Sequence, residues 1–149
     1  MELTVYLSGE IHTNWREEII EKCNKLSLPI VFLSAVTDHE LSDDVGANIL
    51  GPEEKKFWHD HKSAKINSIR TKNAIEQSDI VIVRFGDKYK QWNAAFDAGF
   101  AAAMSKSLII IHNDENQHAL KEIDVVAQAV TSDVEQVIKI LDYICSSKI

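Results

Sequence analysis

At 149 residues, with 45% apolar and 26% charged side chains, the chain has the composition of one globular domain rather than of a disordered or membrane protein. Its formal net charge of −7 disfavours binding to a nucleic acid polymer, because a basic face supplies most of that affinity. No apolar run approaches the roughly 18 residues of a membrane helix. Residues 1–4 lack the basic start and apolar continuation of a signal peptide, so we expect none. Together with two widely spaced cysteines, this predicts a cytoplasmic protein with free thiols and no membrane contact.

Short β-branched apolar runs alternate with amphipathic stretches, which is the pattern of repeated βα units around a parallel sheet. The expected strands are residues 3–8, 30–33, 79–83, 108–112 and 125–130. Helices are expected after Asn14, over residues 53–77, over residues 93–104 and after Ser132. The sequence leaves open whether the second of these is broken near residues 61–63. Asn14 with Glu17, and Ser132 with Glu135, have the spacing of capping boxes.

Residues 35–52 interrupt this alternation with a long polar and acidic stretch. Loops of this length inside a compact domain are usually functional, so we expect a structureless lid or mobile insert. Gly46 and Gly51 are its candidate hinges.

These elements predict a flavodoxin-like, doubly wound α/β domain over residues 1–149, with five parallel strands in the order 2-1-3-4-5. Strand order then reverses between the first and third strands, and ligands bind at such a reversal, beyond the carboxyl ends of the strands. We therefore expect the loops 8–14 and 84–92 to face a ligand crevice that the start of the 93–104 helix borders.

The first of these loops concentrates polar residues directly after a strand. Gly9 permits a sharp turn, and the helix that follows offers free N–H groups to a phosphate or carboxylate. The alternative is an ordinary βα turn in which Glu10, His12 and Arg16 are surface residues.

Asp97 stands out in the 93–104 helix, which is otherwise small and apolar. In the first turns of a helix, the dipole would keep such a carboxylate ionised, as a nucleophile or hydroxyl acceptor requires. The alternative is an acid that merely favours the helix start or makes a contact between helices.

Several segments resemble the nucleoside 2-deoxyribosyltransferase superfamily. They are Ser78–Val83, Ala95–Ala103, Leu108–Ile110 and the strand and turn Tyr6–Gly9. Two polar loops, Gly9–Arg16 and Phe85–Asn93, are similar more narrowly to the YtoQ family, a branch of that superfamily.

In the transferases, a glutamate of the motif Phe/Met-Glu-x-Gly-Tyr-Ala attacks the anomeric carbon, and another base or water then replaces the departing base. The resemblance puts Asp97, one methylene shorter, at the nucleophile position, with Tyr6 as its hydrogen-bonding partner. It implies a nucleoside or nucleotide-like small molecule as ligand, no cofactor, and a homo-oligomer. The expected ligand-binding residues are Ser8, Gly9, Glu10, His12, Asp87, Trp92 and Asn93.

Two other functions remain open, a non-catalytic nucleotide sensor and an oligomeric scaffold with Trp15, Trp58 and Trp92 at its interfaces. Arg70 and Lys72 could reach a phosphate, and Tyr89 could stack on a base or anchor a subunit contact. The His59-x-His61 pair points to different helix faces and lacks further ligands, so we predict no metal site.

Overall fold

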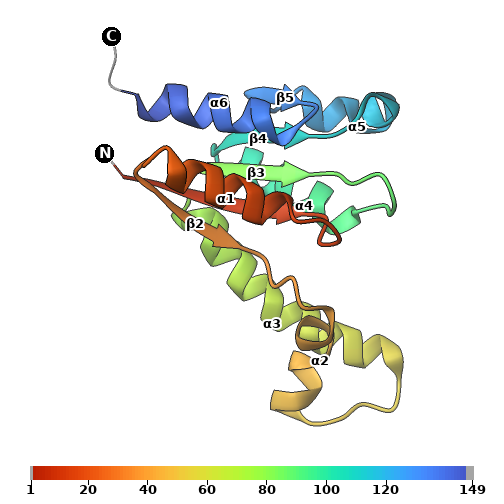
Figure 1. The fold of residues 1–149 in the computed structure, drawn as a ribbon. Coiled ribbons are helices and arrows are strands. Elements are labelled where there is room, and N and C mark those ends of the chain that lie inside the picture. The colour runs from red at the N-terminus through yellow and green to blue at the C-terminus, as the bar shows by residue number, and fades with distance from the viewer. Residues whose placement is uncertain (1, 147–149) are drawn as a thin grey trace.

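The computed structural model describes residues 2–146 and contains a five-stranded parallel sheet with helices on both faces (Figure 1). The strands are β1 (Leu3–Gly9), β2 (Ile30–Ser34), β3 (Ile80–Arg84), β4 (Ser107–Ile111) and β5 (Ala129–Thr131). The helices are α1 (Trp15–Lys25), α2 (His39–Leu50), α3 (Lys56–Gln77), α4 (Trp92–Ala103), α5 (Gln117–Asp124) and α6 (Val134–Cys145), with a short 3-10 turn, η1 (Asp114–Asn116), before α5. The strand order β2-β1-β3-β4-β5 confirms the predicted topology.

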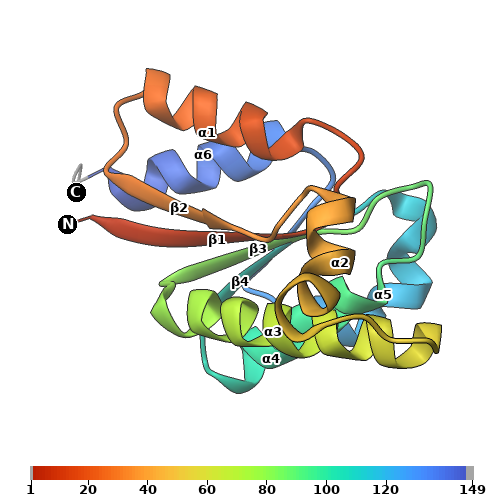
Figure 2. The same cartoon turned by 90° about the horizontal axis from the view of Figure 1, so that it is seen from below.

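Two apolar layers hold the helices to the sheet (Figure 2). Side chains alternate between the faces of a strand, so Val5 and Leu7 of β1 pack with α1 and α6, whereas Tyr6 packs with α3 and α4. Ser8, two residues after Tyr6, points to the same side. The strand pattern therefore directs two polar side chains of β1 toward α4.

The segment 35–52 is mostly helix, so the expectation that it lacks regular structure is wrong. Helix α2 begins after Asp38, whose carboxylate accepts a hydrogen bond from the Leu41 N–H at 3.0 Å. Gly46 lies buried where α2 crosses α3, and a Cβ there would come within 2.5 Å of the Ser63 nitrogen. This glycine permits a close helix crossing and is not a hinge.

Several predicted boundaries also differ from the structure. Helix α3 is continuous, with no break at 61–63. The Asn14 side chain makes no capping hydrogen bond. The cap of α6 is Asp133, whose carboxylate accepts the Gln136 N–H at 2.9 Å, one residue later than the predicted box. Residues 125–128 turn out of α5, so β5 is shorter than expected.

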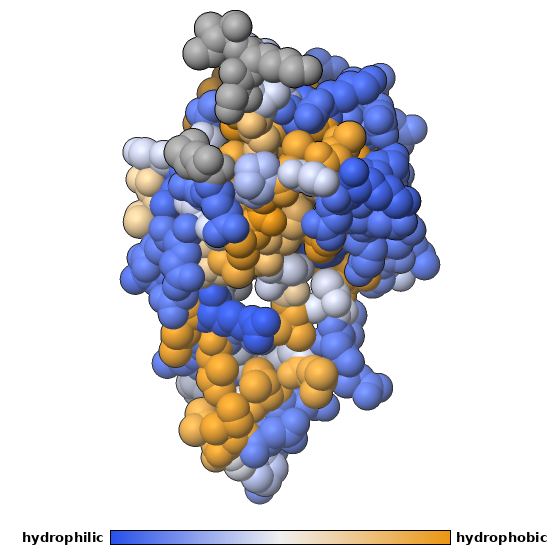
Figure 3. Space-filling model, turned by 60° about the vertical axis from the view of Figure 1, so that its left-hand side comes forward, coloured by the Kyte–Doolittle hydropathy of each residue, from blue (hydrophilic) through white to orange (hydrophobic). Residues whose placement is uncertain are grey.

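Helices α2 and α3 pack together and project beyond the sheet (Figure 1). Apolar side chains gather on the outside of this projecting part, and the surface is hollowed between it and the sheet (Figure 3). The exposed apolar residues of the pair are Leu41, Ile49, Leu50, Phe57, Trp58 and Ile69. No helix within residues 2–146 is long and apolar enough to cross a membrane.

Candidate functional site

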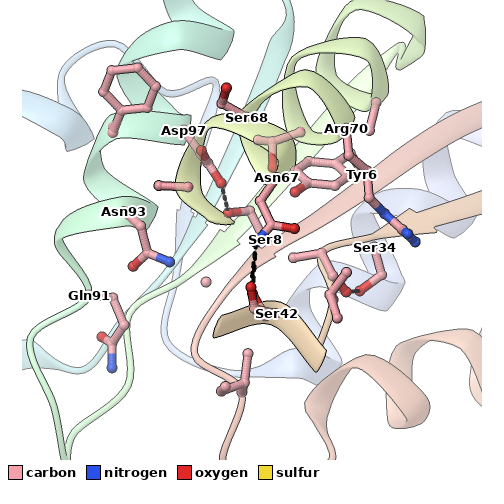
Figure 4. Close-up of a pocket in the computed structure, with 18 of the residues that line it drawn as sticks. Tyr6, Ser8, Ser34, Ser42, Asn67, Ser68, Arg70, Gln91, Asn93 and Asp97 are labelled. Carbon is pink, nitrogen blue, oxygen red and sulfur yellow. Dashed lines mark hydrogen bonds between the residues drawn. The ribbon is translucent and has the colours of Figure 1, made fainter. Parts of the chain in front are cut away.

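A cleft of about 1540 Å³ lies beyond the carboxyl ends of β1 and β2, between α4 and the α2–α3 pair (Figure 4). It occupies the predicted reversal of strand order. Polar side chains from five elements and two loops converge there. Those labelled in Figure 4 belong to β1, β2, α2, α3, α4 and the loop before α4.

Gly9 ends β1 opposite Arg84 of β3. Its φ is 112°, and a Cβ there would lie 2.0 Å from the Arg84 carbonyl oxygen, so a larger residue would force the two strands apart. Arg16 is buried behind this turn and donates to the carbonyl oxygens of Leu7, Gly9 and Glu10. Burial lowers the pKa of Arg16. Arg16 thus fixes the turn and is not a surface residue.

Glu10 is likewise buried, with 4% of its surface exposed. Its carboxylate accepts the N–H groups of His12 at 2.7 Å and Thr13 at 3.2 Å, and the Thr13 hydroxyl. Burial raises the pKa of Glu10, but these hydrogen bonds and the charge of Arg84, 3.3 Å away, outweigh burial and leave it lowered. Glu10 is therefore an ionised brace that shapes the wall of the cleft.

Asp97 lies in the second turn of α4 and only 8% of its surface is exposed. The Ser8 hydroxyl donates to its Oδ2 at 2.5 Å, and no described lysine, arginine or histidine forms an ion pair with it. Burial raises the pKa of Asp97, and the Ser8 hydrogen bond offsets only part of this rise. Asp97 lies beyond the first turn of α4, where the influence of the helix dipole has fallen off.

The expected hydrogen bond between Tyr6 and Asp97 does not form. The Tyr6 hydroxyl is buried and bonds to no residue within 2–146, while Ser8, one position further along the same face of β1, takes the carboxylate. Burial, followed by the charge of Asp97, raises the pKa of Tyr6 to about 12. The side chain that contacts Asp97 is therefore a serine that sequence analysis assigned to ligand binding.

The other predicted ligand-binding residues divide into two groups. Asn93 and His12 line the cleft together with Ser8, Gly9 and Glu10. Asp87 and Trp92 are not among the residues that line it. The Asp87 carboxylate accepts a hydrogen bond from the Asn113 amide, and Trp92 is 74% exposed on the outside of α4.

Three segments meet at His12. Its ring packs against Tyr89, at 4.7 Å between centroids, and stacks near His39 at 6.3 Å. These side chains come from the β1–α1 loop, the β3–α4 loop and the start of α2. They form an aromatic rim at one end of the cleft.

Sequence analysis missed the contribution of α2 to the cleft. Asn67 of α3 donates to the Ser42 carbonyl and hydroxyl oxygens at 3.0 and 3.1 Å, which holds α2 beside the site. The signal was present in the sequence, because Asp38 is a favoured N-cap and Gly51-Pro52 is a typical helix stop.

The structure also places the tryptophans that were expected at subunit interfaces and the two histidines of the His59-x-His61 pair. Trp15 is buried in the core, so it does not serve an interface, whereas Trp58 and Trp92 are exposed. His59 pairs with Asp44 at 3.2 Å rather than with His61. Within residues 2–146, no three histidine, cysteine, aspartate or glutamate side chains gather as metal ligands.

A family model described as nucleoside 2-deoxyribosyltransferase YtoQ matches residues 6–145. The chain belongs to the YtoQ family. The uncharacterized protein YtoQ of Bacillus subtilis (strain 168) is 46% identical over 144 residues, which cover 97% of each chain. The predicted resemblance to the YtoQ family is therefore confirmed.

Solved structures share the fold at low sequence identity. A conserved protein from Enterococcus faecalis V583 is 12% identical with a TM-score of 0.67, over 96% of this chain and 99% of that chain. The 2-deoxyribosyltransferase of Bacillus psychrosaccharolyticus is 17% identical with a TM-score of 0.53, over 91% and 90%. The CMP N-glycosidase BcmB of Clostridium botulinum is 14% identical with a TM-score of 0.54, over 94% and 98%.

Proposed function

We propose that this YtoQ-family protein breaks the N-glycosidic bond of a nucleoside or nucleotide, with Asp97 as the nucleophile. The observation that carries the proposal is a buried carboxylate on the wall of the cleft, held by one neutral hydroxyl. The Ser8 hydrogen bond favours the ionised form that a nucleophile needs, and no cation within the described residues competes for the second carboxylate oxygen. The fold shared with a 2-deoxyribosyltransferase and a CMP N-glycosidase supports this choice of reaction.

The proposed reaction has two steps. The carboxylate oxygen of Asp97 that Ser8 does not hold attacks the anomeric carbon, the bond from that carbon to the base nitrogen breaks, and its electron pair leaves with the base. The base takes a proton from water. In the second step water, or the ring nitrogen of another base, attacks the anomeric carbon of the glycosyl ester and restores the carboxylate. The proton that the attacking group loses neutralises the hydroxide left by the first step.

Ser8 orients the nucleophile in this scheme. Its hydroxyl holds Oδ2, so the carboxylate has one preferred rotation, and a fixed approach geometry lowers the entropic part of the barrier. The aromatic rim of His12 and Tyr89 offers a face on which a base can stack. Asn93 offers both a donor and an acceptor to the edge of a base or sugar.

Release of free base tests the proposal. Wild-type protein is incubated with ribo- and 2′-deoxyribonucleosides and their 5′-monophosphates, with and without a second base as acceptor, and the products are separated by chromatography. We expect base release or exchange that falls at least about a thousandfold in Asp97→Asn. Asp142→Asn, an exposed aspartate on α6, is the control and should match wild type. Equal rates in wild type and Asp97→Asn would contradict the proposal.

A second candidate is a non-catalytic nucleotide sensor, which the raised pKa of Asp97 favours. Burial disfavours the ionised form that a nucleophile needs, whereas a sensor needs no nucleophile. Calorimetric binding of a panel member without base release by the wild-type protein would support the sensor.

We also propose that a second copy of the chain covers the outer face of α4. Trp92 and Phe96 are 74% and 72% exposed, and the half-buried Phe100 continues their stripe at a spacing of four residues. Two copies of a chain with a net charge of −7 repel each other, so an uncharged stripe is the favourable place for them to meet. Phe96 and Phe100 also line the cleft, so a second copy there would border the site.

Light scattering at micromolar concentration tests this assembly. We expect an oligomer mass for the wild type and a smaller mass for Trp92→Glu, which puts a charge into the stripe. Tyr143→Glu is the matched control, because Tyr143 is an 81% exposed aromatic residue on α6. A monomer mass for wild type would contradict the proposal.

A further inference from the structure

We infer that the ligand of this cleft carries a phosphate monoester on its sugar, a nucleoside 5′-monophosphate rather than a nucleoside, and that Arg70 of α3 binds the phosphate. The inference rests on the proposed function, because it names the substrate class of that same site. Four cationic side chains line the cleft, and the argument for Arg70 starts from what each of them contacts.

Arg70 is the guanidinium that lines the cleft without an ion pair to any residue within 2–146. The three lysines have partners: Lys56 lies 3.9 Å from Asp60, Lys72 lies 3.7 Å from Glu76, and Lys90 lies 5.7 Å from the ring centre of Trp92. An arginine presents a planar fork of donors that matches two phosphate oxygens at once. Arg70 is thus the lining cation best suited to an anion supplied by a ligand.

The position of Arg70 on α3 also sets it apart from its neighbours on the same face. Ser63 and Asn67 occupy the two preceding turns, and both are engaged by α2: the Ser63 hydroxyl accepts the Gly46 N–H at 3.0 Å, and Asn67 donates to Ser42. Arg70 comes one turn later, and its side chain makes no hydrogen bond to any described residue. Unlike Ser63 and Asn67, Arg70 therefore lines the cleft without holding α2.

Tyr6 lies between Arg70 and Asp97 (Figure 4). Burial raises the pKa of its hydroxyl most, and the charge of Asp97 raises it further. The charges of Arg16 and then Arg70 lower this pKa, so Asp97 and Arg70 both lie within electrostatic range of one hydroxyl. The cleft thus presents a carboxylate on one side of Tyr6 and a guanidinium on the other, neither ion-paired within the described residues. A ligand that matches them has an electrophilic carbon at one end and an anion at the other.

A nucleoside 5′-monophosphate has this arrangement. Positive charge develops on its anomeric carbon as the glycosidic bond breaks, and its phosphate is anionic on the same sugar ring. The matching nucleoside offers Arg70 only a neutral 5′-hydroxyl. Substrate preference for the phosphate should therefore depend on this one side chain.

The test compares each nucleoside with its 5′-monophosphate. For wild type we expect kcat/KM for base release to favour the monophosphate, and we expect Arg70→Gln to reduce this preference ratio by about tenfold to a hundredfold, the usual effect of losing a hydrogen bond to a charged group. Arg70→Lys should recover part of the ratio because it keeps the charge but not the fork. Lys65→Gln is the control, since Lys65 is exposed on α3 and is not among the residues lining the cleft.

A binding measurement separates failure of this inference from failure of the proposed function. Calorimetric titration of Asp97→Asn with cytidine, cytidine 5′-monophosphate, thymidine and thymidine 5′-monophosphate needs no turnover. If Asp97→Asn binds the monophosphates more tightly than the nucleosides, and adding Arg70→Gln to that variant removes the difference, the inference is supported even if no base is released. Equal binding or equal base release for nucleosides and monophosphates, or a preference that Arg70→Gln leaves intact, overturns it.

Discussion

The Ser8 hydroxyl lies 2.5 Å from Oδ2 of Asp97 and donates a hydrogen bond to it across 89 positions of sequence. The two residues meet because Ser8 follows Tyr6 on the α4 side of β1, and because α4 packs against β1 and β3. Burial and then a neutral hydroxyl, rather than a cation, thus set the pKa of the carboxyl group.

Loss of this hydrogen bond should move the pH dependence of activity. Burial raises the pKa of Asp97 and the Ser8 hydroxyl lowers it, so Ser8→Ala removes the stabilising influence and raises the pKa further. A nucleophile acts only when ionised, so activity rises with pH through this pKa. We expect the acid limb of the kcat/KM profile to shift to higher pH, and the rate below it to fall by about tenfold.

Ser34→Ala is the control for this profile. Ser34 ends the neighbouring strand β2, and its hydroxyl donates to the Ala35 carbonyl instead of to a carboxylate. Its acid limb should coincide with that of wild type. An unshifted limb in Ser8→Ala would mean that Asp97 does not govern the profile.

Asp97→Asn should make the folded protein more stable near neutral pH. Because burial raises the pKa of Asp97 in the folded state above its unfolded value, the native state binds more protons between these two values, and stability falls as pH rises through that interval. The neutral side-chain amide of Asp97→Asn does not ionise, so the loss of stability at higher pH disappears. The amide keeps the shape of the carboxyl group and an oxygen that accepts the hydrogen bond from Ser8.

Urea denaturation of both proteins at several pH values measures the effect. The free energy of unfolding of Asp97→Asn should exceed that of wild type at about pH 7, and the difference should shrink as pH approaches the unfolded value of about 4. A difference that does not depend on pH would show that the carboxylate is not strained by burial.

The sheet was predictable because its signals are local. Apolar β-branched runs such as Ile80–Val83 mark buried parallel strands, and the alternation with helices leaves few topologies. Helix α2 was missed because Leu41 and Ile49 are exposed, so the segment lacks the buried stripe from which a helix is usually recognised. Its end signals, Asp38 and Gly51-Pro52, carried the information instead.

The site was predictable in its position but not in its contacts. Topology determines where strand ends meet, so the turn after β1 and the start of α4 were expected to border one crevice. Whether Tyr6 or Ser8 reaches Asp97 depends on displacements about as small as the length of one methylene group. Packing between β1 and α4 sets those displacements. The sequence did not decide whether Arg16 and Glu10 belong to the site or to the protein surface, because burial of a charged residue depends on partners distant in sequence.

Gly46→Ala should destabilise the protein by about 1–3 kcal/mol, the usual effect of forcing a methyl group into a packed contact. Its Cβ would lie 2.5 Å from the Lys62 Cβ and from the Ser63 nitrogen, so α2 must move away from α3. Gly99→Ala is the control, because no atom lies within 4 Å of a Cβ there and α4 should gain about 0.5–1 kcal/mol. Urea denaturation measures both, and a Gly46→Ala variant as stable as Gly99→Ala would contradict the close crossing.

The central claim, that Asp97 is the nucleophile, is tested most directly by trapping the glycosyl ester. The protein is incubated with nucleosides and 5′-monophosphates whose sugar carries fluorine at the 2′ position, which slows hydrolysis of the ester, and is then analysed by intact and peptide mass spectrometry. We predict an adduct with the mass of the sugar or sugar phosphate on the peptide containing Asp97, and no adduct in Asp97→Asn. If the wild type releases base but carries the adduct on another residue, the account is contradicted. Undiminished base release by Asp97→Asn would contradict it as well.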